Sequence, residues 1–428
     1  MERKSWRLRL APALLAVAWV SPLPAAEAPL PAGGPPPPAA TAAPRLYGNM
    51  PLIIDPTPRD RLPFHFAAHH IAEDSSLLVV HTDFFPVPWR ELAAGEAPPE
   101  AWSREMDAIR GLQERVGLPV YLALTPIEGS RDRLKFGASG TYALTQDESR
   151  SVVCEPIDQR PDYQTVIRPG YRRYVTAMID RFQPRFVALS IEVNLYAMNC
   201  PAAWPAMKRL INETYDMVKA RYRSLPAFQT FQVDALWQAR DQSNPCFGFR
   251  RDCLHSNFAP LADLKTDLFA ISSYPIDTYL HNGRQLPDDY LTALAKLSGK
   301  PLAVAETGYQ AATFSGVAGG ACFPGLPSSP ADQAWWMGRL LADAERARMP
   351  FVVWWADEDL MPETALEPCD CQDGSVWCQL MQILDQPGRD SLRFFGTMGL
   401  RAFDGTPRPA LDLWTAAVAR SRGGQAAQ

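Results

Sequence analysis

The chain has 428 residues, of which 47% are hydrophobic and 21% are charged, and its formal net charge is -5. This composition is typical of a folded globular protein with a large core, and the small negative charge excludes the basic surface that nucleic-acid binding requires. The length would accommodate two average domains, but a barrel of alternating strands and helices commonly uses about 250 residues or more as one domain.

The N-terminal segment is predicted to be an export signal followed by a linker. Four basic residues, Arg3, Lys4, Arg7 and Arg9, precede an apolar segment at 10–20, and small residues follow up to position 28. This order predicts a signal peptide at 1–28 and a secreted or periplasmic protein; an uncleaved membrane anchor is the alternative. Residues 29–45 are Pro- and Ala-rich and predict an extended linker, because such a segment buries too little apolar surface to offset its ordering entropy.

The even number of cysteines fits an exported protein with cross-linked loops. They are Cys154, Cys200, Cys246, Cys253, Cys322, Cys369, Cys371 and Cys378, and we expect all of them in loops and none inside a strand. Cys246 and Cys253 are the easiest pair to propose, because the loop between them is short. A zinc site at positions 369, 371 and 378 is the alternative, but only three cysteines cluster there and no histidine is near, so no metal is expected.

In chain order, apolar segments predict eight strands, at 46–54, 76–81, 118–124, 185–192, 227–234, 267–274, 301–305 and 351–355. Helical patterns lie at 64–73, 100–116, 169–182, 204–222, 288–297 and 330–349. The last of these has Ser329 as a candidate N-cap and Pro330 in its first turn. The polar stretch 128–165 is long enough to be a functional loop, and 418–428 is expected to be a disordered tail. Regular alternation predicts the α/β class, a single-domain (β/α)8 TIM barrel at 46–417 with long disulfide-linked loops.

Two of these strands end in a glutamate. Glu192 ends the fourth strand and Glu306 follows the seventh, where parallel strands of such a barrel carry the chemistry. Two carboxyl groups that face each other across a barrel mouth are what glycoside hydrolysis with retention requires. Their repulsion and partial burial raise one pKa, so that a proton is available near neutral pH. A salt-bridged structural role for each glutamate is the alternative.

Short segments at four strand ends resemble clan A of the glycoside hydrolases, and most of all its family 53, the endo-β-1,4-galactanases. They are Ala305-Glu306-Thr307-Gly308-Tyr309, Ser190-Ile191-Glu192-Val193-Asn194, residues 267–275 and Trp354-Trp355. The resemblance implies that Glu306 is the nucleophile and Glu192 the acid/base. It also implies that Tyr274 contacts the nucleophile and that Trp354 or Trp355 floors the subsite for the cleaved sugar. The chain departs from the clan at Ile191, where an asparagine usually binds the sugar 2-hydroxyl; Asn194 stands nearby.

Other strand ends offer further groups for a sugar. Trp89, Trp237, Tyr274, Trp354 and Trp355 could stack on the apolar faces of sugars, with core packing as the rival explanation for each. Asp83, Gln232 and Asp234 could bind hydroxyl groups.

The pair Asn212-Glu213 matches the clan's usual dipeptide, but it lies in a helical pattern that would coat the barrel, far from the mouth. The expected function is hydrolysis of a β-linked carbohydrate by a monomer without a cofactor, free of the membrane once the signal is cleaved. The alternative is a barrel that binds carbohydrate and has lost the chemistry, with Ile191 as its signature. A third possibility is a glycan-active protein whose partner supplies a missing group.

Overall fold

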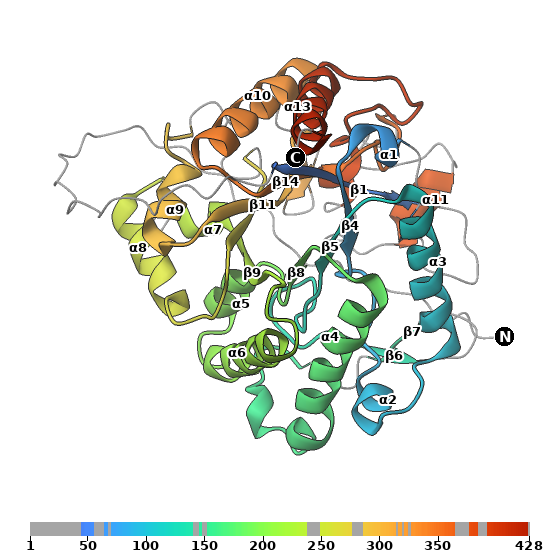
Figure 1. Cartoon of the computed structure of the whole chain (residues 1–428), viewed down its shortest axis with the longest axis vertical. Coiled ribbons are helices and arrows are strands. Elements are labelled where there is room, and N and C mark those ends of the chain that lie inside the picture. Colours follow the sequence, from blue (N-terminus) through green and yellow to red (C-terminus); the bar gives the residue numbers. More distant parts are fainter. Residues whose placement is uncertain are drawn as a thin grey trace.

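Eight parallel strands close into a barrel in the computed structural model (Figure 1). The structure describes residues 44–54, 64–66, 70–139, 145–147, 152–237, 249–275, 286–313, 316–318, 321–323, 327–363, 376–383 and 392–426. The predicted signal peptide, most of the linker, and Cys246, Cys369 and Cys371 lie outside these residues. Within them, no helix is both long enough and apolar enough to cross a bilayer.

The barrel strands are β1 (Leu46–Met50), β4 (Leu77–His81), β5 (Val120–Ala123), β8 (Phe186–Ala188), β9 (Ala227–Gln232), β10 (Phe269–Ser273), β11 (Leu302–Thr307) and β14 (Phe351–Ala356). They follow one another around the ring in chain order, and the pairing of β1 with both β14 and β4 closes it. Each coincides with one of the eight predicted strands, so the predicted TIM barrel is confirmed. Most of these strands are largely apolar because both faces of a parallel barrel are buried, whereas β9 also buries Gln229, Thr230 and Gln232.

The helices surround the strands (Figure 1). They are α1 (Ile71–Asp74), α2 (Trp89–Ala94), α3 (Glu100–Val116), α4 (Arg168–Phe182), α5 (Val193–Asn199), α6 (Trp204–Arg221), α7 (Val233–Trp237), α8 (Arg251–Phe258), α9 (Thr292–Ser298), α10 (Pro330–Arg346), α11 (Val376–Ile383) and α13 (Pro409–Ala426), with short turns η2 (Ile157–Gln159), η3 (Tyr163–Ile167) and η4 (Ala259–Leu261). Ser329 caps α10 as predicted, because its hydroxyl accepts a hydrogen bond from the backbone N–H of Asp332.

Two local predictions near the N-terminal strand are wrong. The strand predicted at 46–54 breaks at Pro51, which has no N–H for the ladder, and continues as β2 (Leu52–Ile54). The helix predicted at 64–73 is instead a strand, β3 (Phe64–Phe66), followed after a gap in the described residues by the single turn α1. Antiparallel pairing of β2 with β3 decides this, a contact that a single-sequence pattern does not reveal. Two further short hairpins are β6 (Gly137–Ser139) with β7 (Thr145–Asp147) and β12 (Gly316–Ala318) with β13 (Ala321–Phe323).

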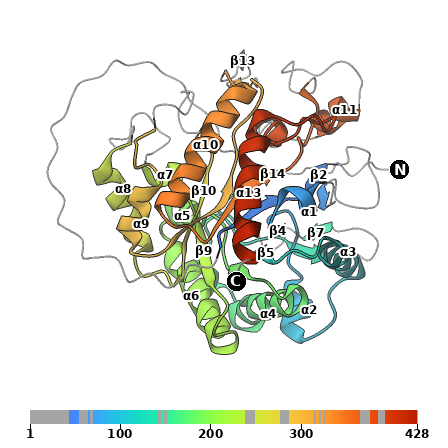
Figure 2. The same cartoon turned by 45° about the horizontal axis from the view of Figure 1, so that its top comes forward.

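The C-terminal tail is helical rather than disordered over most of its length. Helix α13 continues to Ala426 and packs beside α10 (Figure 2). Val418 is buried, the Ser421 hydroxyl donates to the backbone carbonyl of Arg45, and the Arg422 guanidinium donates to the carbonyl of Ala72. These contacts with the start of the barrel order a segment whose composition alone predicted disorder.

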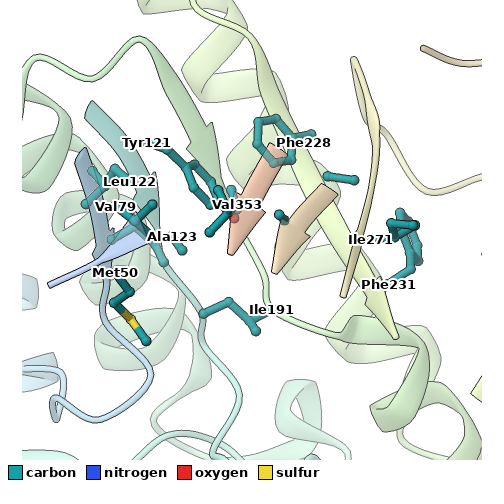
Figure 3. Packing of buried hydrophobic residues seen from close by; sticks show 14 of the residues in the cluster. Met50, Val79, Tyr121, Leu122, Ala123, Ile191, Phe228, Phe231, Ile271 and Val353 are labelled. Atoms are coloured by element: carbon teal, nitrogen blue, oxygen red, sulfur yellow. The ribbon is translucent and has the colours of Figure 1, made fainter. Parts of the chain in front are cut away.

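Aromatic rings fill one level of the barrel interior. Phe351 from β14 lies 4.6 Å from Phe186, 5.2 Å from Tyr121 and 5.8 Å from Phe228, measured between ring centroids. Figure 3 shows Tyr121 and Phe228 with Val353 in this packed core. Since side chains alternate along a strand, the inward series from Phe351 through Val353 brings Trp355 to the C-terminal end of the barrel.

One disulfide is fully described, and it joins Cys154 to Cys200. It ties the loop predicted at 128–165 to the end of α5, which confirms a disulfide-linked loop. Cys253 and Cys378 are also disulfide-bonded. The prediction that every cysteine lies in a loop is wrong, because Cys253 lies in α8, Cys378 in α11 and Cys322 in β13. Cys246, the predicted partner of Cys253, lies outside the described residues, as do Cys369 and Cys371.

Candidate active site

Glu306 lies in β11 at the C-terminal end of the barrel, and its carboxylate meets groups from two other strands. The Tyr274 hydroxyl, just after β10, donates a hydrogen bond to Oε1 of Glu306. His81, the last residue of β4, places Nε2 3.1 Å from Oε2. Glu306 is only 8% exposed, so both contacts form with little water around them. Contacts to both of its oxygens fix the orientation of this buried carboxyl group.

Glu192 follows β8 and stands at the N-terminus of α5. Its backbone is in the left-handed region, with φ of 47°, and its N–H donates to the Thr230 hydroxyl at 2.8 Å. This turn directs the side chain to the same end of the barrel as Glu306, and the strand order confirms that β8 and β11 are three positions apart. Burial raises the pKa of Glu192, the Arg131 cation opposes that rise, and the nearby charges of Glu306 and Asp83 add to it. The two glutamates therefore interact electrostatically.

Arg131 joins Glu192 to Asp83. Its Nε and Nη2 atoms lie 3.2 and 3.1 Å from Oε2 of Glu192. Its Nη1 and Nη2 atoms bind the two carboxylate oxygens of Asp83 at 3.0 and 2.7 Å. Lys135 donates to the backbone carbonyl of Asp83 and lies 3.5 Å from its Oδ1. Although burial alone would raise the pKa of Asp83, the charges of Arg131 and Lys135 hold it well below its usual range.

The tryptophans on β14 separate into two roles. The Trp355 ring is 5.9 Å from that of His81 and 6.3 Å from that of Tyr274, which places it beside Glu306. Trp354 is completely buried, and its ring N–H donates to the backbone carbonyl of Met398 at 2.7 Å. Adjacent residues of a strand point to opposite faces, so only Trp355 faces the site. The structure therefore places Trp355, and not Trp354, beside the groups around Glu306.

Several predicted binding residues instead support the scaffold. Trp89 and Trp237 are buried, and their ring N–H groups donate to the carbonyls of Lys135 and Tyr290. The Asn194 amide is used by the backbone of Gln232, with contacts of 2.8 and 3.0 Å. In this structure the polar atoms of these three residues are already engaged inside the fold.

Gln232 and Asp234 belong to the same internal network. The Gln232 amide donates to Asp234 at 2.9 Å, and Asp234 also accepts hydrogen bonds from the Tyr290 hydroxyl and from the backbone N–H of Tyr274 at 3.1 Å. Asp234 therefore holds Tyr274, which in turn contacts Glu306.

Of the predicted residues, the structure brings together Glu192, Glu306, Tyr274, Trp355 and Asp83. Sequence reasoning missed His81, Arg131 and Lys135 at this site. His81 has a usable signal, because it ends an apolar strand just as Glu306 does. Arg131 and Lys135 lie in the polar loop 128–165, which was predicted to be functional without any one residue standing out.

Asn212 and Glu213 lie in a helix, as their sequence pattern predicted. Glu213 sits in α6 and pairs with Arg168 of α4 at 2.6 Å, on the outer layer of helices. Across the described ranges, no group of three or more His, Cys, Asp or Glu side chains is arranged to hold a metal ion. The chemistry that the assembled site can perform is proton transfer and nucleophilic attack by carboxylates.

No protein-family model matches this chain, and no curated protein matches it. Among solved structures, it is similar to the GH53 catalytic domain of Ignisphaera aggregans, with 15% identity over 80% of this chain and 84% of that one, and a TM-score of 0.44. A structure of fungal β-1,4-galactanases shares 14% identity over 80% of this chain and 88% of that one, with a TM-score of 0.44. A GH5_18 protein of Bifidobacterium longum in complex with Manb1-4GlcNAc shares 16% identity over 82% and 71%, with a TM-score of 0.47. These likenesses have identities of 14–16% and TM-scores below 0.5, so an activity has to be argued from the site itself.

Proposed function

We propose that this chain is a retaining glycoside hydrolase that acts on a β-linked poly- or oligosaccharide. Glu306 is the nucleophile, and Glu192 is the acid/base. The observation that carries the proposal is the contrast between the surroundings of two carboxyl groups that interact electrostatically at one end of the barrel. Glu306 accepts a hydrogen bond from Tyr274 and lies beside His81 Nε2, whereas burial and the charge of Glu306 raise the pKa of Glu192. A carboxyl group with a raised pKa suits the acid, and a carboxyl group held in place by fixed partners suits the nucleophile.

The reaction has two steps. The Glu306 carboxylate attacks the anomeric carbon while the proton of Glu192 passes to the departing glycosidic oxygen, which leaves a glycosyl ester on Glu306. Glu192, now ionised, takes a proton from water as that water attacks the anomeric carbon. The ester bond to Glu306 breaks, Glu192 is protonated again, and the sugar leaves with its original configuration. Trp355, beside Glu306, would support the ring of the sugar under attack.

The test combines a substrate panel with matched variants. The panel contains 4-nitrophenyl β-glycosides and β-glycans, with β-1,4-galactan first, because the segments on strands six and seven resemble family 53. Glu306→Gln and Glu192→Gln should each reduce turnover of an accepted glycan by about a thousandfold or more. Glu213→Gln, which removes a carboxylate from the outer helix α6, should leave turnover unchanged. Turnover by Glu306→Gln at the wild-type rate would refute the assignment, and NMR of the first product should show retention.

The alternative is a carbohydrate-binding barrel with impaired chemistry. Two observations favour it: Ile191 is buried and apolar at the position before Glu192, and Arg131 already pairs with Glu192. The same panel distinguishes the two, because tight binding of a glycan without release of reducing ends would support the alternative.

Export remains part of the proposal. It rests on the basic and apolar order of residues 1–28, and the Cys154–Cys200 disulfide fits an oxidising compartment. Mass spectrometry of the mature N-terminus from the periplasm or culture fluid should find cleavage near residue 28.

A further inference from the structure

The ion pair between Arg131 and Glu192 uses only one oxygen of the glutamate. Both guanidinium nitrogens that reach the glutamate contact the same oxygen, Oε2, and leave Oε1 outside the pair. A carboxyl group fixed through one oxygen in this way can rotate little about its Cγ–Cδ bond. Because the fixed oxygen accepts hydrogen bonds from a cation, the proton that the group exchanges belongs on the other oxygen. Arg131 is 6% exposed, so little water competes for these bonds.

The backbone around Arg131 is held in a costly conformation. Arg131 has a φ of 55°, and Cys154 and Glu192 have φ of 50° and 47°. The described part of the chain has five non-glycine residues with positive φ, and three of them are at this site. Such backbone conformations persist only where the surroundings enforce them, and they cluster at functional sites.

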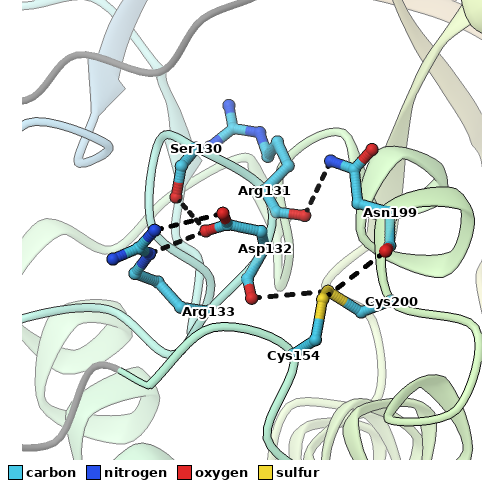
Figure 4. The surroundings of a disulfide bond; sticks show 7 residues. All are labelled: Ser130, Arg131, Asp132, Arg133, Cys154, Asn199 and Cys200. Atoms are coloured by element: carbon cyan, nitrogen blue, oxygen red, sulfur yellow. Dashed lines mark hydrogen bonds and ion pairs between the residues drawn. A yellow bond between two sulfur atoms is a disulfide. The ribbon is translucent and has the colours of Figure 1, made fainter.

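The Cys154–Cys200 disulfide and the residues around it hold the backbone of Arg131 in this conformation (Figure 4). The backbone carbonyl of Arg131 accepts a hydrogen bond from the Asn199 amide at 3.1 Å, and the N–H of Cys154 donates to the carbonyl of Asp132 at 2.6 Å. Asn199 ends helix α5, which begins directly after Glu192. One short helix therefore carries the proposed acid at its start and the anchor of the Arg131 loop at its end.

Asp83 competes with Glu192 for the charge of Arg131. The arginine makes two hydrogen bonds with separate oxygens of Asp83, so its cation is divided between two carboxylates. The other ionisable groups that act on this cluster are Glu306 and Tyr274 beside Glu192, with His81 and Lys135 near Asp83. Burial acts most strongly on Glu192, and together with the charges of Glu306 and Asp83 it leaves the pKa of Glu192 raised although a cation touches the carboxyl group.

We propose that Arg131 is a positioning residue for proton transfer, which fixes the Glu192 carboxyl through Oε2 and leaves Oε1 to carry the proton. Asp83 sets the share of the arginine's charge that Glu192 experiences, and the tether through Asn199 and Cys154–Cys200 keeps the arginine in place. This inference rests on the proposed role of Glu192 as the acid/base.

The first test measures Glu192 directly and needs no substrate. The protein is labelled with carbon-13 at the glutamate side-chain carboxyls, and the Glu192 resonance is assigned by its absence in Glu192→Gln. Asp83→Asn should lower the pKa of Glu192 by about 1, because one anion is lost and the arginine keeps a single carboxylate partner. Arg131→Gln should raise the pKa by about 1 or more, and Arg131→Lys should restore part of the difference, since it retains the charge but not the two-pronged geometry.

Arg168→Gln is the matched control, because it removes an arginine from the outer Arg168–Glu213 pair and should leave the titration of Glu192 unchanged. Opposite movements of the Glu192 titration in Asp83→Asn and Arg131→Gln support the inference. Movement in the same direction, or none, overturns it. If Arg131→Gln does not fold, the Asp83→Asn and Arg131→Lys results decide the question alone: the inference stands only if Asp83→Asn lowers the pKa of Glu192 while Arg131→Lys does not.

The second test uses kcat/KM on whichever 4-nitrophenyl β-glycoside is hydrolysed. The alkaline limb of its pH profile reports the acid, so it should move to lower pH in Asp83→Asn and to higher pH in Arg131→Gln. A residue that merely held the loop would reduce activity without moving this limb in opposite directions. If no glycoside is turned over, the proposed hydrolase function fails, whereas the titration still decides whether Arg131 and Asp83 control Glu192.

Discussion

Asp357 should make this protein less stable as the pH rises from acidic to neutral. It follows β14, is only 4% exposed, and lies near the carboxylates of Asp74 and Glu358. Arg401 is close, but it pairs with Asp74 at 2.7 Å. Burial, followed by the charge of Asp74, raises the pKa of Asp357 from 3.8 to about 7. The substitution Asp357→Asn removes the ionisation and keeps the shape of the side chain.

The direction of this pH dependence is set by the state, folded or unfolded, that holds the Asp357 proton more tightly. Between pH 4 and pH 7 the folded protein keeps a proton on Asp357 that the unfolded chain has released, so ionisation favours unfolding and stability falls as the pH rises. With 1.36 kcal/mol for each unit between 3.8 and about 7, the destabilisation approaches about 4 kcal/mol above pH 7. Roughly 2–3 kcal/mol of it develops between pH 5 and pH 8. Asp357→Asn should therefore gain that amount over wild type as the pH rises across this interval.

Urea unfolding of both proteins at pH 5 and pH 8 measures this difference. Asp412→Asn is the control, because Asp412 is exposed on α13 and its substitution should leave the pH dependence of wild type intact. If the stabilities of wild type and Asp357→Asn change in parallel between pH 5 and pH 8, then burial does not raise the pKa of Asp357.

Three further outcomes are expected. Tyr274→Phe removes the hydroxyl that donates to the proposed nucleophile. Because a hydrogen bond to a charged group contributes about 1.5–3 kcal/mol, kcat/KM should fall by about 10- to 150-fold. Unchanged kinetics would contradict that role. Trp355→Ala should reduce kcat/KM by at least about tenfold, because the ring lies beside the proposed nucleophile. Trp354→Phe should leave KM unchanged and lower the free energy of unfolding in urea by about 1–3 kcal/mol. A raised KM in Trp354→Phe would reverse the two roles. Replacing both Cys154 and Cys200 by serine should lower the free energy of unfolding by about 4 kcal/mol, since the bridged residues are 46 apart, and urea midpoints equal to wild type would contradict this.

Much of the fold could be predicted because barrel strands are local signals. Most strands are largely apolar and buried on both faces, and Glu192 and Glu306 stand out because a charge follows or ends such a segment. The wrong predictions arose where a distant contact overrides the local pattern. Pairing with β2 makes residues 64–66 a strand, and contacts with Arg45 and Ala72 order a tail that has little apolar content of its own.

The amino-acid sequence alone determined the barrel, its eight strands and the two carboxylates at its mouth, since each depends on neighbours a few positions away. Only the tertiary structure decided which of Trp354 and Trp355 faces the site, because a strand pattern does not say which of its two faces is inside. It also decided that Arg131 meets Glu192, from 61 positions away. That pairing depends on how a long loop closes over the barrel, and loop closure is set by contacts that no local pattern encodes.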